Sequence, residues 1–310
     1  MIRNIFIAGI IFILLSSCST YTTFYGETVR TLDVDGKTRR LDVSYQNLKE
    51  LPVSFEKLQT LRMLNLSGNT QLDIPEILAS LPHPEKLEIL VLDSLQLKKI
   101  PEVVRDYKNL KQVSLAYNPD LDIEKTITVI KELPLEFLNL KGNQLTELPE
   151  TITHLKTLKD LNLSYNKLHD ENSYTYLGAM PNLYSLWLDH NHLTQLPKTI
   201  GAIDQITYFY IDNNALTYLP QEMERMKGLR VLHAGYNSFT ELPEQFIKMP
   251  SLIMVHINNN QIASFSRKYE TEKYAMLALL LDHNPLPEEE RLWAEKTFKK
   301  FFLLSFEQTF

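Results

Sequence analysis

Leu135-Glu136-Phe137-Leu138-Asn139-Leu140-Lys141-Gly142-Asn143-Gln144-Leu145 is the stretch that decides the fold. It reads L-x-x-L-x-L-x-x-N-x-L, and ten further copies of this pattern lie within residues 38–286. The asparagine position recurs every 23 to 26 residues and is occupied by Gln46, Asn69, Leu95, Asn118, Asn143, Asn166, Asn191, Asn214, Asn237, Asn260 and Asn284. A period of this length is typical of a solenoid, in which each repeat forms one coil that stacks on the next.

The L-x-L alternation in each copy predicts a short strand that turns its leucines toward the core and its variable residues toward solvent. The asparagine follows the strand, where the chain turns. A buried side-chain amide at this point can satisfy backbone groups of adjacent coils that would otherwise lack partners. We therefore interpret the nine asparagines as structural residues.

Seven copies are followed by an apolar residue and a proline, such as Leu148-Pro149. Proline fixes φ, so these pairs direct the chain toward the opposite, convex side of the coil. Residues 150–155 and their equivalents then place apolar side chains at helix-like intervals over one or two turns. The expected fold is an α/β solenoid, a horseshoe of about eleven repeats with a parallel β-sheet on its concave side.

This pattern resembles the leucine-rich-repeat family of the 23-residue type, and the resemblance covers about residues 38–286. Two copies depart from it. Leu95 cannot make the amide hydrogen bonds, and it follows a spacing of 26 residues that contains Leu81-Pro82-His83-Pro84, so we expect a local irregularity there. Gln46 lies in the first coil, where repeats are usually atypical.

Both ends of a solenoid need a cover, because they would otherwise expose leucines. Residues 28–43 alternate around Asp35-Gly36, which predicts a hairpin and an N-terminal cap over residues 28–37. Pro287 and the three following glutamates predict the start of a C-terminal capping helix over residues 287–310. The apolar residues expected to pack on the last coil are Trp293, Phe298, Phe301, Phe302 and Leu304.

Residues 1–17 have the features of a signal peptide. Arg3 gives the only charge, and the apolar run over residues 5–15 is too short for a permanent membrane helix. Leu15-Ser16-Ser17-Cys18 resembles the lipobox of bacterial lipoproteins. This resemblance implies a lipid anchor on Cys18, a tether over residues 18–27 and a place in the bacterial cell envelope, with Ser19 favouring the outer membrane. The alternative is an ordinary secretory signal with an incidental cysteine.

Composition excludes several classes of function. The net charge is −6, and without a local basic patch the chain lacks the cations that dominate nucleic-acid binding, so we expect no nucleic-acid partner. Cys18 is the only cysteine, which excludes an internal disulfide, a four-cysteine zinc site and an internal cysteine nucleophile. The chain contains no Gly-rich phosphate-binding loop of the Walker type. We expect no cofactor and a monomer.

The residues between the leucines of each strand are predicted to form the concave face. The central row reads Asp42, Asn65, Val91, Ser114, Asn139, Asn162, Trp187, Tyr210, His233, His256 and Leu280. Adjacent strands lie about 4.8 Å apart, so the four consecutive rings should stack as a ladder. The candidate ligand-binding residues are these rings and their neighbours: Tyr184, Trp187, Asp189, Tyr208, Tyr210, Asp212, His233 and His256.

Large rigid rings with carboxylates around them are typical of an interaction surface, and they also suit sugar stacking. We therefore predict a non-enzymatic, envelope-anchored module that binds a protein or a glycan. One alternative is that the rings are only good cross-strand neighbours; another is a signalling scaffold of the intracellular type. His233, His256 and Asp212 form an incomplete metal-ligand set. Catalysis would need a shielded pocket, whereas this surface should be open and regular.

Overall fold

The computed structural model describes residues 28–51 and 53–307, which divide into two compact units. The first unit contains residues 28–95 and 101–114, and the second contains residues 96–100 and 115–307. The predicted signal peptide, the lipidation of Cys18 and the tether lie outside the described residues. No helix in the described part of the chain has the length and apolar character needed to cross a membrane.

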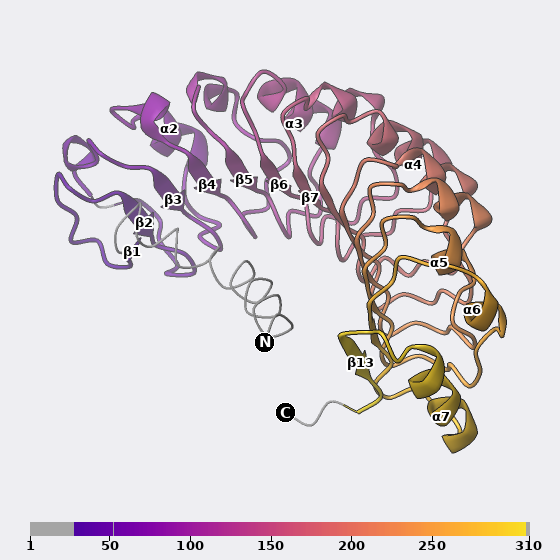
Figure 1. Cartoon of the computed structure of the whole chain (residues 1–310). Coiled ribbons are helices and arrows are strands. Elements are labelled where there is room, and N and C mark those ends of the chain that lie inside the picture. Colours follow the sequence, from indigo (N-terminus) through magenta and orange to yellow (C-terminus); the bar gives the residue numbers. More distant parts are fainter. Residues whose placement is uncertain (1–27, 52, 308–310) are drawn as a thin grey trace. The chain divides into compact units, whose positions relative to one another are not determined.

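In the first unit, five short strands pair in chain order and all are parallel. They are β1 (Thr28–Val29), β2 (Arg40–Asp42), β3 (Met63–Asn65), β4 (Ile89–Val91) and β5 (Gln112–Ser114). The helical segments between them are η1 (Phe55–Lys57), α2 (Ile74–Ala79), η2 (Pro84–Lys86) and η3 (Glu102–Asp106). The strands line one side of this unit and the helical segments line the other (Figure 1).

The second unit repeats the same arrangement in eight parallel strands. They are β6 (Phe137–Asn139), β7 (Asp160–Asn162), β8 (Ser185–Trp187), β9 (Tyr208–Tyr210), β10 (Val231–His233), β11 (Met254–His256), β12 (Ala278–Leu280) and β13 (Leu303–Ser305). The helical segments are α3 (Ile123–Ile130), η4 (Glu150–His154), α4 (Glu171–Gly178), η5 (Lys198–Ala202), η6 (Gln221–Arg225), α5 (Gln245–Lys248), α6 (Lys268–Thr271) and α7 (Glu288–Thr297). The prediction of an α/β solenoid built on a parallel sheet is confirmed.

The core consists of the inward-facing middle residue of each strand together with the apolar residues that follow it. Leu161, Leu186 and Phe209 align across neighbouring strands and are fully buried. The outward-facing residues on either side of them are only partly buried in most strands. The leucines of each coil pack against those of the next coil, so the hydrophobic interior is continuous within a unit.

The length of a repeat decides which helical segment it holds. Repeats with spacings of 25 or 26 residues contain the α-helices α2, α3 and α4, which are six to eight residues long. Most repeats of 23 residues contain a 3-10 segment of three to five residues. An α-helix rises less per residue than a 3-10 helix, so it needs more residues to cover the same span. The irregularity expected before Leu95 is a coil that contains both α2 and η2.

The buried asparagines link neighbouring coils through backbone groups, as Asn166 illustrates. Its side-chain oxygen accepts hydrogen bonds from the backbone N–H groups of Asn143 (3.0 Å) and Leu145 (2.9 Å) in the preceding coil. Its amide nitrogen donates to the carbonyl oxygens of Leu140 (3.0 Å) and Leu163 (2.9 Å). One amide thus satisfies donors and acceptors of two coils in a site that excludes water.

The N-terminal hairpin prediction was wrong. β1 pairs with β2 in parallel, with Thr28 opposite Arg40, whereas a hairpin would make the pairing antiparallel. The turn at Asp35 does form, since the N–H of Thr38 donates to the carbonyl of Asp35 at 3.1 Å. This turn lies inside an additional partial coil that connects β1 to β2. β1 runs parallel to β2 and so extends the same sheet by one strand.

The C-terminal segment differs from the continuous helix that was expected. α7 begins at Glu288, directly after Pro287, but it ends at Thr297, and the chain then adds β13 to the sheet. Phe298 lies between α7 and β13 in the chain and is buried. Its ring centroid lies 6.0 Å from that of Phe265 and 5.6 Å from that of Tyr269. The last coil is therefore covered by a helix, a strand and an aromatic cluster.

Candidate binding site

Four rings of the central row form a continuous stack on the open face of the sheet in the second unit, which we call the aromatic ladder. The register of β8 to β11 places Trp187, Tyr210, His233 and His256 opposite one another. The centroid distances are 5.1, 4.5 and 4.1 Å, and the interplanar angles are 7, 24 and 13°. All four side chains are partly buried. The strand register predicted from the sequence therefore brings these rings together.

Two further predicted residues lie beside the ladder, at the amino ends of the strands. Tyr184 and Tyr208 meet edge to face, with centroids 5.3 Å apart. Tyr184 is exposed, whereas Tyr208 is partly buried, and burial raises the pKa of the Tyr208 hydroxyl. This pair extends the aromatic surface across the width of the sheet.

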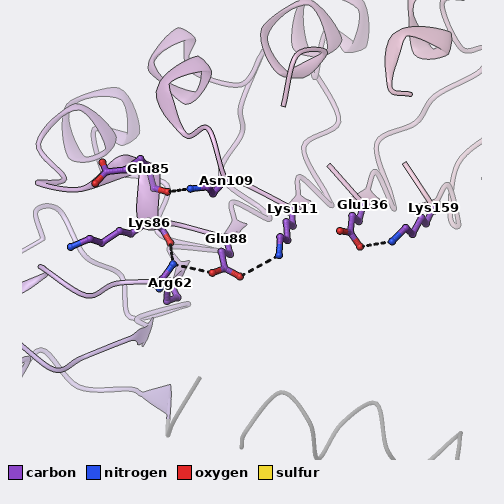
Figure 2. Close-up of polar contacts among 8 residues, drawn as sticks. All are labelled: Arg62, Glu85, Lys86, Glu88, Asn109, Lys111, Glu136 and Lys159. Carbon is purple, nitrogen blue, oxygen red and sulfur yellow. Dashed lines mark hydrogen bonds and ion pairs between the residues drawn. The ribbon is translucent and has the colours of Figure 1, made fainter. Parts of the chain in front are cut away.

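The row that contains Tyr184 has a different character in earlier coils, where it holds alternating charges (Figure 2). In the first unit, the carboxylate of Glu88 lies 3.0 Å from Arg62 and 3.9 Å from Lys111. In the second unit, Lys159 lies 2.9 Å from Glu136. Opposite charges on adjacent strands satisfy one another, so this row supports the sheet in those coils. The change to an aromatic residue occurs at Tyr184.

A shallow depression of about 500 Å³ adjoins the aromatic ladder at the carboxyl ends of the strands. Its rim includes Tyr165 and His190, whose rings stack at 4.0 Å and 22°, and the ammonium group of Lys141 lies 4.5 Å from the Tyr165 centroid. The remaining lining residues are Asn162, Ser164, Trp187, Asp189, Tyr210, Asp212, Asn213, His233, Tyr236 and Asn258. The depression therefore combines three rings of the ladder, Trp187, Tyr210 and His233, with residues from the following turns.

Asp189 and Asp212 lie side by side in this depression. One oxygen of Asp189 accepts a hydrogen bond from the Ser164 hydroxyl (2.9 Å), and the other accepts from the N–H of Asp212 (3.2 Å). Asp212 in turn accepts from the N–H of Gly235 at 2.7 Å. Burial, with the nearby charge of Asp189, raises the pKa of Asp212 to about 7. A negative charge on Asp212 is therefore unfavourable beside that of Asp189.

The imidazoles of the ladder are held neutral. Burial and the adjacent His256 ring lower the pKa of His233 to about 3, and burial also lowers the pKa of His256. A metal ion binds an imidazole nitrogen in the plane of the ring, and two nearly parallel stacked rings do not share such a position. Within residues 28–51 and 53–307, no group of three or more His, Cys, Asp or Glu side chains is arranged to hold a metal ion.

The candidate residues predicted from the sequence did not include Lys141, Tyr165, His190 or Tyr236, which also line the depression. Tyr165, His190 and Tyr236 occupy the position before the repeat asparagine, where the backbone is left-handed with φ of 57, 55 and 52°. The same position holds Gly142, with φ of 69°. Reading this second row along the chain, as the central row was read, would have found the aromatic rim.

Comparisons with known proteins agree with the repeat fold. The family model described as Leucine Rich Repeat matches residues 134–155, which contain the stretch that defined the pattern. None of the curated proteins compared with the chain matches it. A solved structure described as the TLR13–ssRNA13 complex is similar with a TM-score of 0.67 and 20% identity, over 90% of this chain and 44% of that one. This chain thus spans less than half of that protein.

Two bacterial structures are also similar. An internalin (inlF) from Listeria monocytogenes has a TM-score of 0.49 and 17% identity, over 89% of this chain and 68% of that one. A leucine-rich-repeat protein of Leptospira interrogans has a TM-score of 0.43 and 21% identity, over 90% of this chain and 99% of that one. At these identities the comparisons do not identify a ligand.

Proposed function

We propose that this leucine-rich-repeat protein is a non-enzymatic binding module that holds a protein ligand on the aromatic ladder and in the adjoining depression. The single observation that supports this most is the continuous stack from Trp187 to His256 beside a depression that contains two carboxylates. Large rigid rings supply contact area at a low cost in conformational entropy, and the carboxylates supply directional polar contacts. We propose that it acts as a monomer.

The ring geometry favours a protein over a glycan. Sugars bind aromatic side chains by lying flat against an open ring face. In the ladder, Tyr210 and His233 each have both faces covered by neighbouring rings, and only their edges point outward. Trp187 has one face that no ladder ring covers, on the side of Asn162. A glycan is therefore the second candidate ligand, and it would bind at this end of the ladder.

The open surface supports binding in preference to catalysis. The depression is shallow, and burial lowers the pKa of its His233 to about 3, so this imidazole is a weak general base at neutral pH. The other histidine that lines the depression, His190, is stacked on the ring of Tyr165. Stabilising a charged transition state also requires donors in a site that excludes water. The proposed activity is therefore ligand capture without turnover.

The location that we propose for this activity is the bacterial cell envelope, where a lipid on Cys18 would anchor the protein, in the outer membrane if the host has two membranes. The support is the lipobox-like sequence that ends at this unique cysteine. Metabolic labelling with a fatty-acid precursor tests the anchor. Label that is present on the wild type, lost in Cys18→Ala and retained in Thr20→Ala supports it. An unlabelled protein in the soluble cell fraction would favour the intracellular scaffold.

Capture of a ligand tests the binding function itself. The purified full chain is immobilised and exposed to surface-protein extracts and to a glycan array, in parallel with Trp187→Ala plus Tyr210→Ala. The matched control is Tyr45→Ala plus Tyr218→Ala, which removes two exposed rings outside the ladder and the depression. Thermal unfolding of each variant checks the fold. A protein ligand that the control retains and the ladder variant loses supports the proposal, whereas retention by both contradicts it.

A further inference from the structure

The depression contains an excess of hydrogen-bond acceptors and negative charge. Asp189 and Asp212 together accept three hydrogen bonds, from a hydroxyl and two backbone N–H groups, but no charged donor is among them. No lysine or arginine in the described part of the chain forms an ion pair with either carboxylate. Two carboxylates that share a partly buried site without a cation repel each other.

One lysine lines the depression, and its ammonium group contacts aromatic rings of the rim. The ammonium group of this residue, Lys141, lies 4.5 Å from the ring centroid of Tyr165 and 5.7 Å from the ring centroid of Tyr117. The aromatic rim therefore already makes a cation–π contact with a cation of the protein itself. The carboxylates of Asp189 and Asp212 can therefore bind a second cation, which the ligand would supply.

Gly235 has no side chain, and this leaves space beside the carboxylate of Asp212. The equivalent position in the two preceding coils holds Asp189 and Asp212. A Cβ at Gly235 would lie 3.0 Å from the Asp212 carboxylate and 2.7 Å from the side-chain oxygen of Asn258. The space that a Cβ would fill at Gly235 is therefore bordered by side-chain oxygens of Asp212 and Asn258. The rings of Tyr210, His233 and Tyr236 line the same depression as these two residues.

We propose that the depression is a receptor for an arginine side chain of the protein ligand, whose guanidinium group binds the carboxylates of Asp189 and Asp212 among the aromatic rings of the rim. A guanidinium is planar, stacks on aromatic faces and carries five donors, so it matches both the rings and the acceptors. An ammonium group has three donors and no planar face, and it fits this combination less well. The inference rests on the proposed binding function and names the chemistry that the ligand must present.

The test uses small probes, so it does not depend on identifying the ligand. The purified full chain is titrated with N-acetyl-L-arginine amide, N-acetyl-L-lysine amide and the uncharged isostere N-acetyl-L-citrulline amide, and binding is followed by NMR chemical shifts of side chains in the depression. The variants are Asp212→Asn, Asp189→Asn and Gly235→Ala. The matched control is Asp93→Asn, which changes an aspartate at the same repeat position in the first unit, where it accepts from Ser114 at 2.5 Å.

We expect the arginine probe to bind saturably, the lysine probe to bind at least threefold more weakly and the citrulline probe about tenfold more weakly, because charge-assisted bonds are the strong ones. Asp212→Asn or Asp189→Asn should weaken arginine binding about tenfold, Gly235→Ala should weaken it at least threefold, and Asp93→Asn should leave it within about twofold. Two aspartate variants are used so that one that fails to fold does not decide the result.

Equal binding of the three probes, no saturable binding of the arginine probe, or an equal loss in Asp93→Asn would overturn the arginine assignment. The proposed function fails differently. If a protein ligand depends on Trp187 and Tyr210 but is insensitive to Asp212→Asn and to competing arginine amide, the binding module stands and only the arginine receptor is wrong. If the arginine probe binds as expected but no protein ligand is captured, the receptor stands and the proposed function loses its support.

Discussion

Replacing Asn166 with alanine tests how the coils are joined. In the wild type its amide accepts from the N–H groups of Asn143 and Leu145 at 3.0 and 2.9 Å and donates to the carbonyls of Leu140 and Leu163 at 3.0 and 2.9 Å. Asn166→Ala leaves two buried N–H groups without acceptors. At about 1–3 kcal/mol for each buried unsatisfied group, the variant should lose about 2–6 kcal/mol of unfolding free energy.

Equilibrium urea unfolding, followed by circular dichroism, measures this loss, and amide hydrogen exchange locates it. The N–H groups of Asn143 and Leu145 should exchange much faster in the variant, because their acceptor has gone. Asn182→Ala is the matched control, since it removes one exposed hydrogen bond of 2.7 Å to the carbonyl of Lys156 and should cost less than about 0.5 kcal/mol. A loss in Asn166→Ala no larger than in the control, with both amides still protected, would refute the reasoning.

The site, a repeat turn and the C-terminal cap each give a further prediction. The pKa of Asp212 is raised from 3.8 to about 7 in the fold, so its ionisation opposes folding: this cost is absent below pH 4, grows through pH 4 to 7 and is complete above pH 7. Asp212→Asn should therefore gain about 1–3 kcal/mol relative to the wild type between pH 5 and pH 8 in urea unfolding, and a constant difference would contradict this. Gly142→Ala should cost about 1–2 kcal/mol in the same assay, because φ is +69° and the new Cβ would overlap the ring of Tyr117, whereas Gly36→Ala, with nothing within 4 Å, should be near neutral. Phe298→Ala should cost about 3–5 kcal/mol and free the C-terminal strand to exchange its amides first, and unchanged protection of β13 would count against the capping role.

The sequence predicts the strands and the stacked rings because one repeat position always faces the same way. The L-x-L alternation assigns Leu186 to the core and Trp187 to the open face, and stacking of the coils then places Tyr210 beside Trp187. No distant contact is needed for this inference. The positions of the repeat asparagines can be predicted in the same way, because each asparagine lies a fixed number of residues after its strand.

The first and last strands, β1 and β13, and the residues at the rim of the depression were harder to predict from the sequence. β1 and β13 lack the repeat pattern, and they join the sheet only because each meets a parallel edge that is already formed. Asp35-Gly36 has local turn chemistry, and tertiary pairing decided that the strands around it run parallel. Tyr165 and Tyr236 adopt a left-handed backbone that tyrosine usually avoids, so local propensity gives no sign of their position.

The central claim is that ligand contacts the ladder and its depression, and site-specific photo-crosslinking in the expressing cells tests it most directly. A photoreactive phenylalanine replaces either Tyr236, at the rim of the depression, or Tyr218, outside it; the two are similarly exposed, at 54% and 52%. We predict a covalent adduct with one partner protein from position 236, its loss when Trp187→Ala and Tyr210→Ala are added, and no such adduct from position 218. An adduct of equal yield from position 218, or none from position 236, would contradict the account.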